Sequence, residues 1–252
     1  MRSPLAVLAA AIFALAACGT TETAAPEPAT SGGTAAPVTV TDSLGRQVKL
    51  DRPATRVVSL EWGETEMLAS LGVMPVGAAD VKGYATWNTA AKLDPSVKDV
   101  GNRQEPSVDS IAALQPDLVV MQAARDSALV PQLEKFVPVL VTKGADAGDD
   151  LKRMSADLTM IATAVGKTTE ATGLLADLDA ALADGKERIA AAGAAGRAFV
   201  MADGWKEGST ISIRPFGQGS LVSQVAGRLG LKNAWTGKVD EVGAWATPTS
   251  RA

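Results

Sequence analysis

The chain has 252 residues, and its 24 Lys and Arg stand against 28 Asp and Glu, which gives a formal net charge of −4. This mild acidity offers no basic face for nucleic acid, and the 46% of hydrophobic residues is enough to bury a core. Histidine is absent and cysteine occurs once, so the sequence excludes a His/Cys zinc site and any Ser-His or Cys-His nucleophile pair.

The amino terminus has the pattern of a lipoprotein signal peptide over residues 1–17. Arg2 precedes an apolar run at 5–17, which is shorter than the roughly 20 residues of a membrane span. Residues 15–18 (LAAC) look like a bacterial lipobox, in which Cys18 becomes the acylated first residue. An ordinary signal peptide with a chance cysteine is the alternative. With a lipobox, a palmitate-type lipid anchor at Cys18 holds the protein at the outer face of the cytoplasmic membrane.

Residues 18–37 contain Thr, Ala, Pro, Gly and Glu but no large apolar side chain. Such a segment buries too little surface to offset the entropy of ordering it, so we expect a disordered tether.

From residue 38 onward, strand and helix patterns alternate. Residues 38–50 predict a hairpin that turns at 42–46, and 56–60 predict a buried strand followed by a helix from Glu64 to the stop at Gly72. Next come a strand at 75–79 and a helix capped by Ser107 that runs to Leu114. A strand at 117–122, a helix at 126–136 and a strand at 137–141 complete the first set. The alternation predicts a parallel sheet covered by helices.

Residues 149–192 are helical in pattern, and apolar positions from Ala171 to Ile189 recur on one face. We expect two consecutive helices there, the second starting near Thr168. Strands at 198–202 and 211–213 and a helix at 218–229 follow. The predicted organisation is an N-terminal α/β lobe at 38–145, a helical connection at 146–195 and a C-terminal α/β lobe at 196–252.

Several segments then carry a family resemblance. VVSLEWGETEMLASLGVMPVGAADVKGY, VGNRQEP followed by PDLVV, FGQGSL and LGLKNAW resemble iron–siderophore substrate-binding lipoproteins of ABC importers, in particular the hydroxamate-siderophore group. The likeness runs from about residue 38 to the end. It implies two Rossmann-like α/β lobes joined by one rigid long helix, with the ligand held in the cleft between them. Relatives continue beyond the segment that matches 245–250, so we expect an incomplete second lobe.

A ferric siderophore brings its own iron coordination shell, so this function needs no cofactor and no metal ligand. The protein has to supply cations for the chelate oxygens and flat surfaces for its carbon skeleton, and arginine suits the first task. The lack of histidine argues against the zinc- and manganese-binding relatives, which use His ligands.

Three arginines are candidates for the chelate oxygens. Arg103 precedes a capped helix on a loop at a strand end, where open α/β sheets bind ligands, and the matching family arginine contacts the chelate. Its alternative is a surface pair with Glu105. By resemblance, Arg125 lies at the cleft mouth, or else is a solvated loop charge. Arg214 is the counterpart in the second lobe.

The aromatic candidates are Trp62, Tyr84 and Trp87, which we expect on loops at strand ends, and Trp245, near where relatives place a cleft aromatic. Stacking on a chelate would use their large area, whereas Trp62 packing under its loop as core is the alternative. We expect Trp235 to be structural, and no pattern assigns a role to Trp205.

For permease docking, relatives present one acidic residue on each lobe. Asp109 matches the first position, or else favours its own helix terminus, and the second position is the neutral Gln224. We interpret Glu61, Glu64 and Glu66 as favouring a helix start rather than as acid/base groups. Phe216–Ser220 lacks the lysine of a phosphate loop and predicts a turn into a helix.

The sequence therefore predicts a monomeric, extracytoplasmic, lipid-anchored binding protein that delivers a ferric siderophore, of the hydroxamate type, to an ABC importer of the iron transport system. The alternatives are cobalamin or haem on the same scaffold, and a non-transporting surface lipoprotein. We expect no enzymatic activity, because no activated nucleophile is present, and no nucleic-acid partner.

Overall fold

The computed structural model describes residues 36–123 and 128–251. The signal peptide, Cys18 and nearly all of the predicted tether lie outside the described residues, as does Arg125. Within the described ranges, no helix combines the length and apolar character that a membrane span requires.

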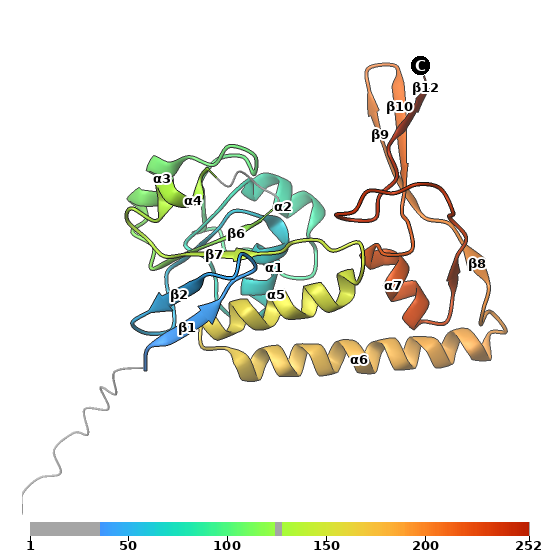
Figure 1. Ribbon diagram of the computed structural model, residues 1–252, viewed down its shortest axis with the longest axis horizontal. Coiled ribbons are helices and arrows are strands. Elements are labelled where there is room, and N and C mark those ends of the chain that lie inside the picture. Colours follow the sequence, from blue (N-terminus) through green and yellow to red (C-terminus); the bar gives the residue numbers. More distant parts are fainter. Residues whose placement is uncertain (1–35, 124–127, 252) are drawn as a thin grey trace, which may run out of the picture. The chain divides into compact units, whose positions relative to one another are not determined.

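Strands and helices alternate along most of the described chain (Figure 1). The strands are β1 (Val38–Thr41), β2 (Gln47–Leu50), β3 (Val57–Ser59), β4 (Gly77–Ala78), β5 (Lys98–Asp99), β6 (Leu118–Gln122), β7 (Val139–Thr142), β8 (Ala198–Phe199), β9 (Ala202–Glu207), β10 (Thr210–Pro215), β11 (Lys232–Asn233) and β12 (Thr249–Arg251). The helices are α1 (Trp62–Ser70), α2 (Val81–Trp87), α3 (Val108–Ala113), α4 (Val130–Leu133), α5 (Asp150–Ala164), α6 (Thr168–Ala191) and α7 (Leu221–Arg228).

The predicted N-terminal hairpin is confirmed, because β1 and β2 pair antiparallel with Val38 opposite Leu50. Asp42 shapes its turn. One carboxylate oxygen accepts hydrogen bonds from the backbone N–H groups of Leu44 and Arg46, and the other accepts from the Arg46 guanidinium. A side chain that satisfies two turn N–H groups is a common stabiliser of such turns.

A five-stranded sheet with the order β5-β4-β3-β6-β7 forms the N-terminal region, and each neighbouring pair is parallel. Strands β3 and β7 are buried along their whole length, as expected of a parallel sheet covered on both faces. The chain adds β4 and β5 on one side of β3, and then β6 and β7 on the other. The strand order therefore reverses between β3 and β6, which is the switch point where open α/β sheets bind ligands.

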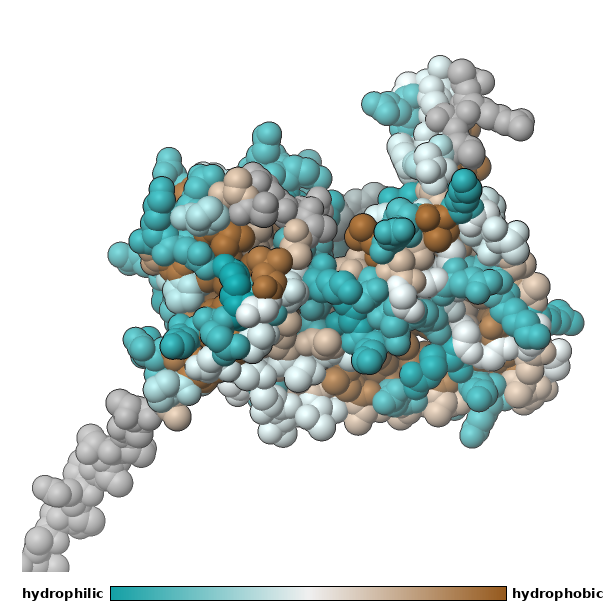
Figure 2. Space-filling view, viewed as in Figure 1, coloured by the Kyte–Doolittle hydropathy of each residue, from teal (hydrophilic) through white to brown (hydrophobic). Residues whose placement is uncertain are grey.

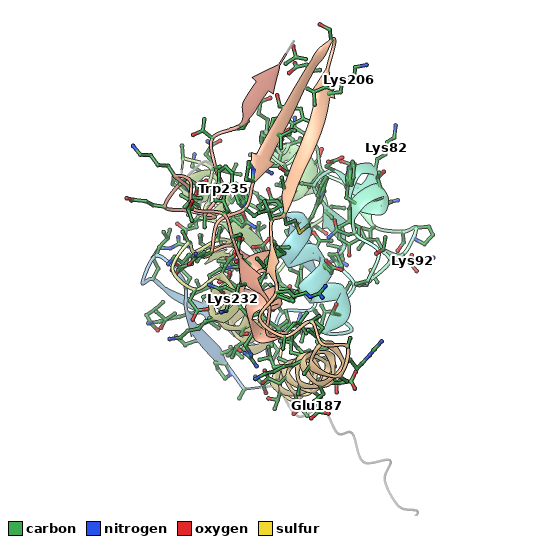
Figure 3. The ribbon with its side chains drawn as sticks, turned by 90° about the vertical axis from the view of Figure 1, so that its right-hand side faces the viewer. Lys82, Lys92, Glu187, Lys206, Lys232 and Trp235 are labelled. Atoms are coloured by element: carbon green, nitrogen blue, oxygen red, sulfur yellow. The ribbon has the colours of Figure 1, made fainter. Side chains whose placement is uncertain are left out.

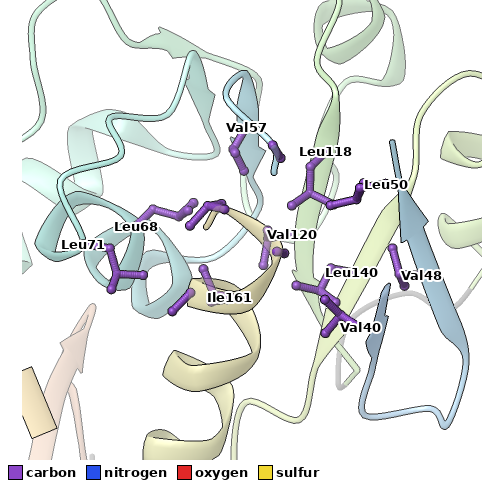
Figure 4. Packing of buried hydrophobic residues seen from close by; sticks show 14 of the residues in the cluster. Val40, Val48, Leu50, Val57, Leu68, Leu71, Leu118, Val120, Leu140 and Ile161 are labelled. Atoms are coloured by element: carbon purple, nitrogen blue, oxygen red, sulfur yellow. The ribbon is translucent and has the colours of Figure 1, made fainter. Parts of the chain in front are cut away.

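The core lies on both faces of this sheet. Alternate residues of β6 divide between two clusters: Leu118 and Val120 pack in one, and Val119 and Met121 pack in the other. In the first cluster, Ile161 of α5 packs with side chains of α1 and of the sheet (Figure 4). The hairpin β1–β2 closes this cluster with Val40, Val48 and Leu50.

The helical connection consists of two consecutive helices, as predicted. Helix α5 packs against α1 and β1, and the 24-residue α6 packs against both α5 and α7 (Figure 1). At 1.5 Å per residue, α6 is about 36 Å long. Ala171 and Leu182, both members of the predicted apolar stripe, are its buried residues.

The C-terminal region contains two small sheets. Strand β10 pairs antiparallel with both β9 and β12, and β8 pairs parallel with β11. Helix α7 begins after Ser220, whose hydroxyl accepts a hydrogen bond from the Ser223 N–H. This confirms the predicted turn into a capped helix.

Three local predictions are wrong. Helix α1 begins at Trp62 rather than Glu64, because Glu61 acts as its N-cap. Residues 81–87 form helix α2 rather than a loop, because the Asp80 carboxylate accepts the Gly83 N–H and caps a helix that Gly83 conceals in the sequence. The helix predicted at 126–136 is described only as the short α4.

Candidate functional site

The candidate site starts at the switch point of the sheet. Glu61 and Trp62 follow β3 one residue after its end, and Arg103 lies between β5 and α3 on the loop that the sequence predicted. Two short turns set this loop: the Asp99 carboxylate accepts the Gly101 N–H, and the Asn102 side chain accepts from Gln104 and Glu105. Gly101 has a φ of +107°, a conformation that strains other residues.

Arg103 and Trp62 are brought together. The guanidinium carbon of Arg103 lies 3.7 Å from the centroid of the Trp62 ring, which is a cation–π contact. The indole N–H of Trp62 donates to the Asp80 carbonyl at 3.2 Å, and this bond fixes the plane of the ring. The half-buried Trp62 therefore does not pack wholly as core.

The partner of Arg103 is Glu61, not Glu105. Its Nη1 donates to Glu61 Oε2 at 2.9 Å, and the same carboxylate oxygen accepts the Trp62 N–H that begins helix α1. The Glu61 side chain is 5% exposed. One carboxylate thus caps the helix and holds the arginine, a dual role that the sequence analysis missed when it assigned Glu61 to the helix start alone.

The other two aromatic residues predicted in this region, Tyr84 and Trp87, differ in their exposure to solvent. Tyr84 is buried, with 1% exposure, and its hydroxyl donates to the Ala91 carbonyl. Burial, with a contribution from Glu66, raises the pKa of Tyr84 to about 12. Trp87 ends helix α2 and is 74% exposed. Both lie on a helix, so the expectation that they lie on a loop is corrected.

Glu64 is fully buried beneath the switch point. Its carboxylate accepts hydrogen bonds from the Thr142 hydroxyl at 2.6 Å and from the Gln122 amide at 3.3 Å. Burial raises the pKa of Glu64, and the bond from Thr142 opposes that effect. The side chain links β6, β7 and α1 at the end of the sheet. Its position in the first helical turn agrees with the sequence prediction, but its burial was not foreseen.

In the C-terminal region, Arg214 lies among two tryptophans and one carboxylate. Its guanidinium carbon is 4.4 Å from the Trp245 ring centroid and 5.8 Å from that of Trp205. Asp203 accepts from Nε at 3.0 Å and from Nη2 at 2.5 Å, which is a bidentate pair. Arg214 and Trp245 were predicted from the sequence, whereas Asp203 and Trp205 were not.

The strand register contains the signal that was missed. Arg214 of β10 pairs with Asp203 of β9, and residues that pair in an antiparallel ladder point to the same face. Trp205 lies two residues after Asp203 and therefore shares that face. A hairpin turn predicted at Gly208 would have put Asp203, Trp205 and Arg214 on one face of the sheet.

The two docking candidates differ in environment. Asp109 is exposed in the first turn of α3. The Gln224 side chain is engaged within the molecule, because its Oε1 accepts the Leu151 N–H at 2.7 Å and so satisfies a free donor at the start of α5. Among the residues that the structure describes, no group of three or more acidic or sulfur ligands is arranged to hold a metal ion.

These features define a class: an α/β protein in which one long helix joins a parallel-sheet region to a smaller α/β region, with an arginine stacked on tryptophan in each. The model of the periplasmic binding protein family matches residues 57–243, and the chain belongs to that family.

Individual relatives agree with this assignment. The putative ABC transporter substrate-binding lipoprotein YhfQ of Bacillus subtilis is 36% identical over 157 residues, which are 61% of this chain and 47% of YhfQ. The iron(3+)-hydroxamate-binding protein FhuD of Escherichia coli is 28% identical, over 78% of this chain and 64% of FhuD. The chain thus spans about half to just under two thirds of the length of these relatives.

Among solved structures, the siderophore-binding protein FhuD of Vibrio cholerae, with Fe3+-Desferal bound, superimposes with a TM-score of 0.67. The match covers 78% of this chain and 72% of that protein at 25% identity. Its two-lobed fold confirms the predicted fold class.

Proposed function

We propose that this chain is the solute-binding component of an ABC importer and that it captures a ferric siderophore of the hydroxamate type. The observation that carries the proposal is the Arg103–Trp62 stack at the switch point of the sheet, in a chain of the periplasmic binding protein family. The ligands printed in the names of the two FhuD proteins, a ferric hydroxamate and Fe3+-Desferal, support the ligand class.

The proposed recognition divides the chelate between two kinds of contact. Hydroxamate oxygens around the iron carry partial negative charge, and the guanidinium of Arg103 donates charge-assisted hydrogen bonds to them. The ring of Trp62 covers part of the carbon skeleton. Iron is cargo that stays in the chelate's own coordination shell, so this chain acts by binding and release and not as an enzyme.

We also propose where the protein is located in the cell and how it meets the permease. Cys18 carries a lipid anchor that keeps the protein at the outer face of the cytoplasmic membrane, which agrees with the lipoprotein name of YhfQ. Asp109, exposed at the start of α3, meets a basic group of the permease. Gln224 is left out of the docking contact, because its side chain is bonded to the start of α5. The protein acts as a monomer.

A fluorescence titration tests the ligand. The five tryptophans report binding of a ferric chelate by quenching, and we expect saturable quenching with ferrioxamine B. Arg103→Ala should weaken binding about tenfold, the equivalent of one lost charge-assisted contact. Arg52→Ala, which removes an exposed arginine from the loop before β3, is the matched control and should bind as the wild type does.

The titration has two adverse outcomes. A folded protein that is not quenched by hydroxamate, catecholate or citrate chelates would contradict the proposal. Displacement of ferrioxamine B by excess cobalamin or haem would instead favour one of those ligands. Arg103→Lys, which keeps the charge but not the planar fork, separates loss of recognition from loss of folding.

Lipid attachment has its own test. Cells that express the chain are labelled with radioactive palmitate, and we expect label on the wild type and none on Cys18→Ser. The variant should also move from the membrane fraction to the soluble fraction, because the acyl chains are its tether. A membrane-bound, unlabelled Cys18→Ser protein would refute the anchor.

A further inference from the structure

Two separate regions of the chain repeat one arrangement, in which an arginine lies over a tryptophan ring and is paired with a carboxylate. In the N-terminal region the residues are Arg103, Trp62 and Glu61. In the C-terminal region Arg214 lies over Trp245 and is paired with Asp203. The two candidate arginines that the structure describes, Arg103 and Arg214, therefore each already have a negative partner.

The pair in the C-terminal region occupies one edge of the arginine. Asp203 takes both Nε and Nη2 of Arg214, which is the edge that would otherwise grip two neighbouring oxygens. Two N–H groups on Nη1 and one on Nη2 are left for a ligand. Arg214 therefore offers a flat cation and its end edge, with the carboxylate of Asp203 beside it.

The pair in the N-terminal region is held in place by the fold. Glu61 is buried and caps helix α1, so it cannot turn away from Arg103 without leaving the helix terminus uncapped. Nη1 of Arg103 donates to this carboxylate, which leaves Nε and Nη2 for a ligand. Arg103 thus keeps more nitrogen donors for a ligand than Arg214 does, while the carboxylate of Glu61 balances its positive charge.

Two lysines of the described residues, Lys206 and Lys82, do not place positive charge beside these arginines. Lys206 follows Trp205 on β9 and alternates to the opposite face of that sheet, and Figure 3 shows it near the far end of the hairpin. Lys82 on α2 is exposed and points outward in the same view. Asp240, whose carboxylate accepts the backbone N–H of Trp245, adds further negative charge next to this residue.

We infer that Glu61 and Asp203 are specificity determinants that favour ferric chelates of low net charge, neutral or singly positive, over strongly anionic ones. This inference rests on the proposed function. A polyanionic chelate would have to approach two carboxylates that already satisfy the arginines, and like charges at close range are a common means of rejecting a wrong ligand. A neutral or cationic chelate meets no such repulsion and still receives the free N–H groups and the tryptophan faces.

The test compares chelates of different charge on the full chain, purified from membranes in detergent. The probes are singly positive ferrioxamine B, neutral ferrichrome and triply negative ferric enterobactin, each titrated by tryptophan quenching. The wild type should bind the first two at least about tenfold more tightly than the third. Asp203→Asn should raise the affinity for ferric enterobactin relative to that for ferrichrome about tenfold, because it exposes the charge of Arg214.

Asp179→Asn is the matched control. It removes one negative charge from α6, where Asp179 pairs with Arg228 on the surface, and should leave the ranking of the three chelates unchanged. Glu61→Gln is the second variant and keeps a side-chain oxygen for the helix cap. It should shift selectivity in the same direction as Asp203→Asn.

The outcomes separate this inference from the proposed function. Absence of binding by all three chelates would overturn the proposed function. Binding of ferric enterobactin as tight as that of ferrioxamine B would overturn the inference alone, as would an Asp203→Asn variant whose ranking matches that of Asp179→Asn.

Discussion

The N-terminal sheet and the C-terminal region are stabilised in different ways. Strands β3, β6 and β7 are buried and lie between two apolar clusters. Strand β9 is exposed along nearly its whole length, and Ile211 and Ile213 of β10 face outward. Figure 2 shows apolar residues at the surface of this region among polar ones. Most of the hydrophobic stabilisation should therefore come from the first region, while ion pairs and ring contacts organise the second.

The difference between the two regions should be greatest for substitutions in the core. Ile161→Ala empties a fully buried site in the first cluster and should lower the free energy of unfolding by about 2–5 kcal/mol. Ile213→Ala makes the same change at a side chain that is 48% exposed and should cost about 0.5 kcal/mol or less. Urea unfolding followed by circular dichroism measures both values. Equal costs would show that the second region has a core of comparable strength.

An intermediate effect is expected where the two regions meet. A Cβ added at Gly219 would lie 1.6 Å from the Ala147 carbonyl oxygen, so Gly219→Ala must displace backbone. We expect a cost of about 1–3 kcal/mol. Hydrogen exchange should increase in residues 198–233 and remain unchanged in β3, β6 and β7.

Gly227→Ala is the control for that substitution. Gly227 lies within α7 with open space around it, so alanine there should stabilise the helix by up to about 1 kcal/mol. Faster exchange throughout the sheet in Gly219→Ala would mean that the two regions unfold as one unit.

The smallest expected effect concerns pH. Burial raises the pKa of Glu64, so the folded state holds a proton that the unfolded state releases as the pH rises above about 4.5. The stability contributed by protonated Glu64 is therefore present at low pH and is lost as the pH rises through its folded pKa. The stability of the wild type relative to Glu64→Gln should decline over this window.

Urea unfolding of both proteins from about pH 4 to about pH 7 measures this decline. Glu187→Gln removes the same charge from an exposed position on α6 and controls for net charge (Figure 3). A constant difference between wild type and Glu64→Gln would contradict the role of burial. The two regions differ in this respect, because the carboxylate of Asp203 in the C-terminal region is 38% exposed whereas that of Glu64 is buried.

Local signals predicted much of the fold. Apolar runs predicted strands β3, β6 and β7, and Ser107 before an apolar stretch predicted the start of α3. The helix predicted at 218–229 is α7, which begins after Ser220. Helix α2 was missed because Gly83 weakens the helical pattern and its cap, Asp80, adopts a left-handed backbone with φ of 52°. Such a cap works only when the surrounding fold holds that conformation.

The site was predicted in part. Arg103 on its loop and Arg214 in the second region follow from resemblance and strand order. Their partners did not follow, because Glu61 is 42 positions from Arg103 and Asp203 is separated from Arg214 by a hairpin whose register the sequence left open. Tyr84 is the opposite case, a predicted binding residue that lies buried with its hydroxyl bonded to Ala91.

Residue patterns alone predicted the family, the longer strands and helices and the lack of histidine chemistry, since these depend on composition and on patterns local in the chain. Tertiary structure alone decided which carboxylate meets which arginine, that Glu64 is buried, and that Gln224 bonds to α5. The physical reason is that charge pairing and burial depend on distances between elements far apart in the chain. Local propensity does not encode those distances.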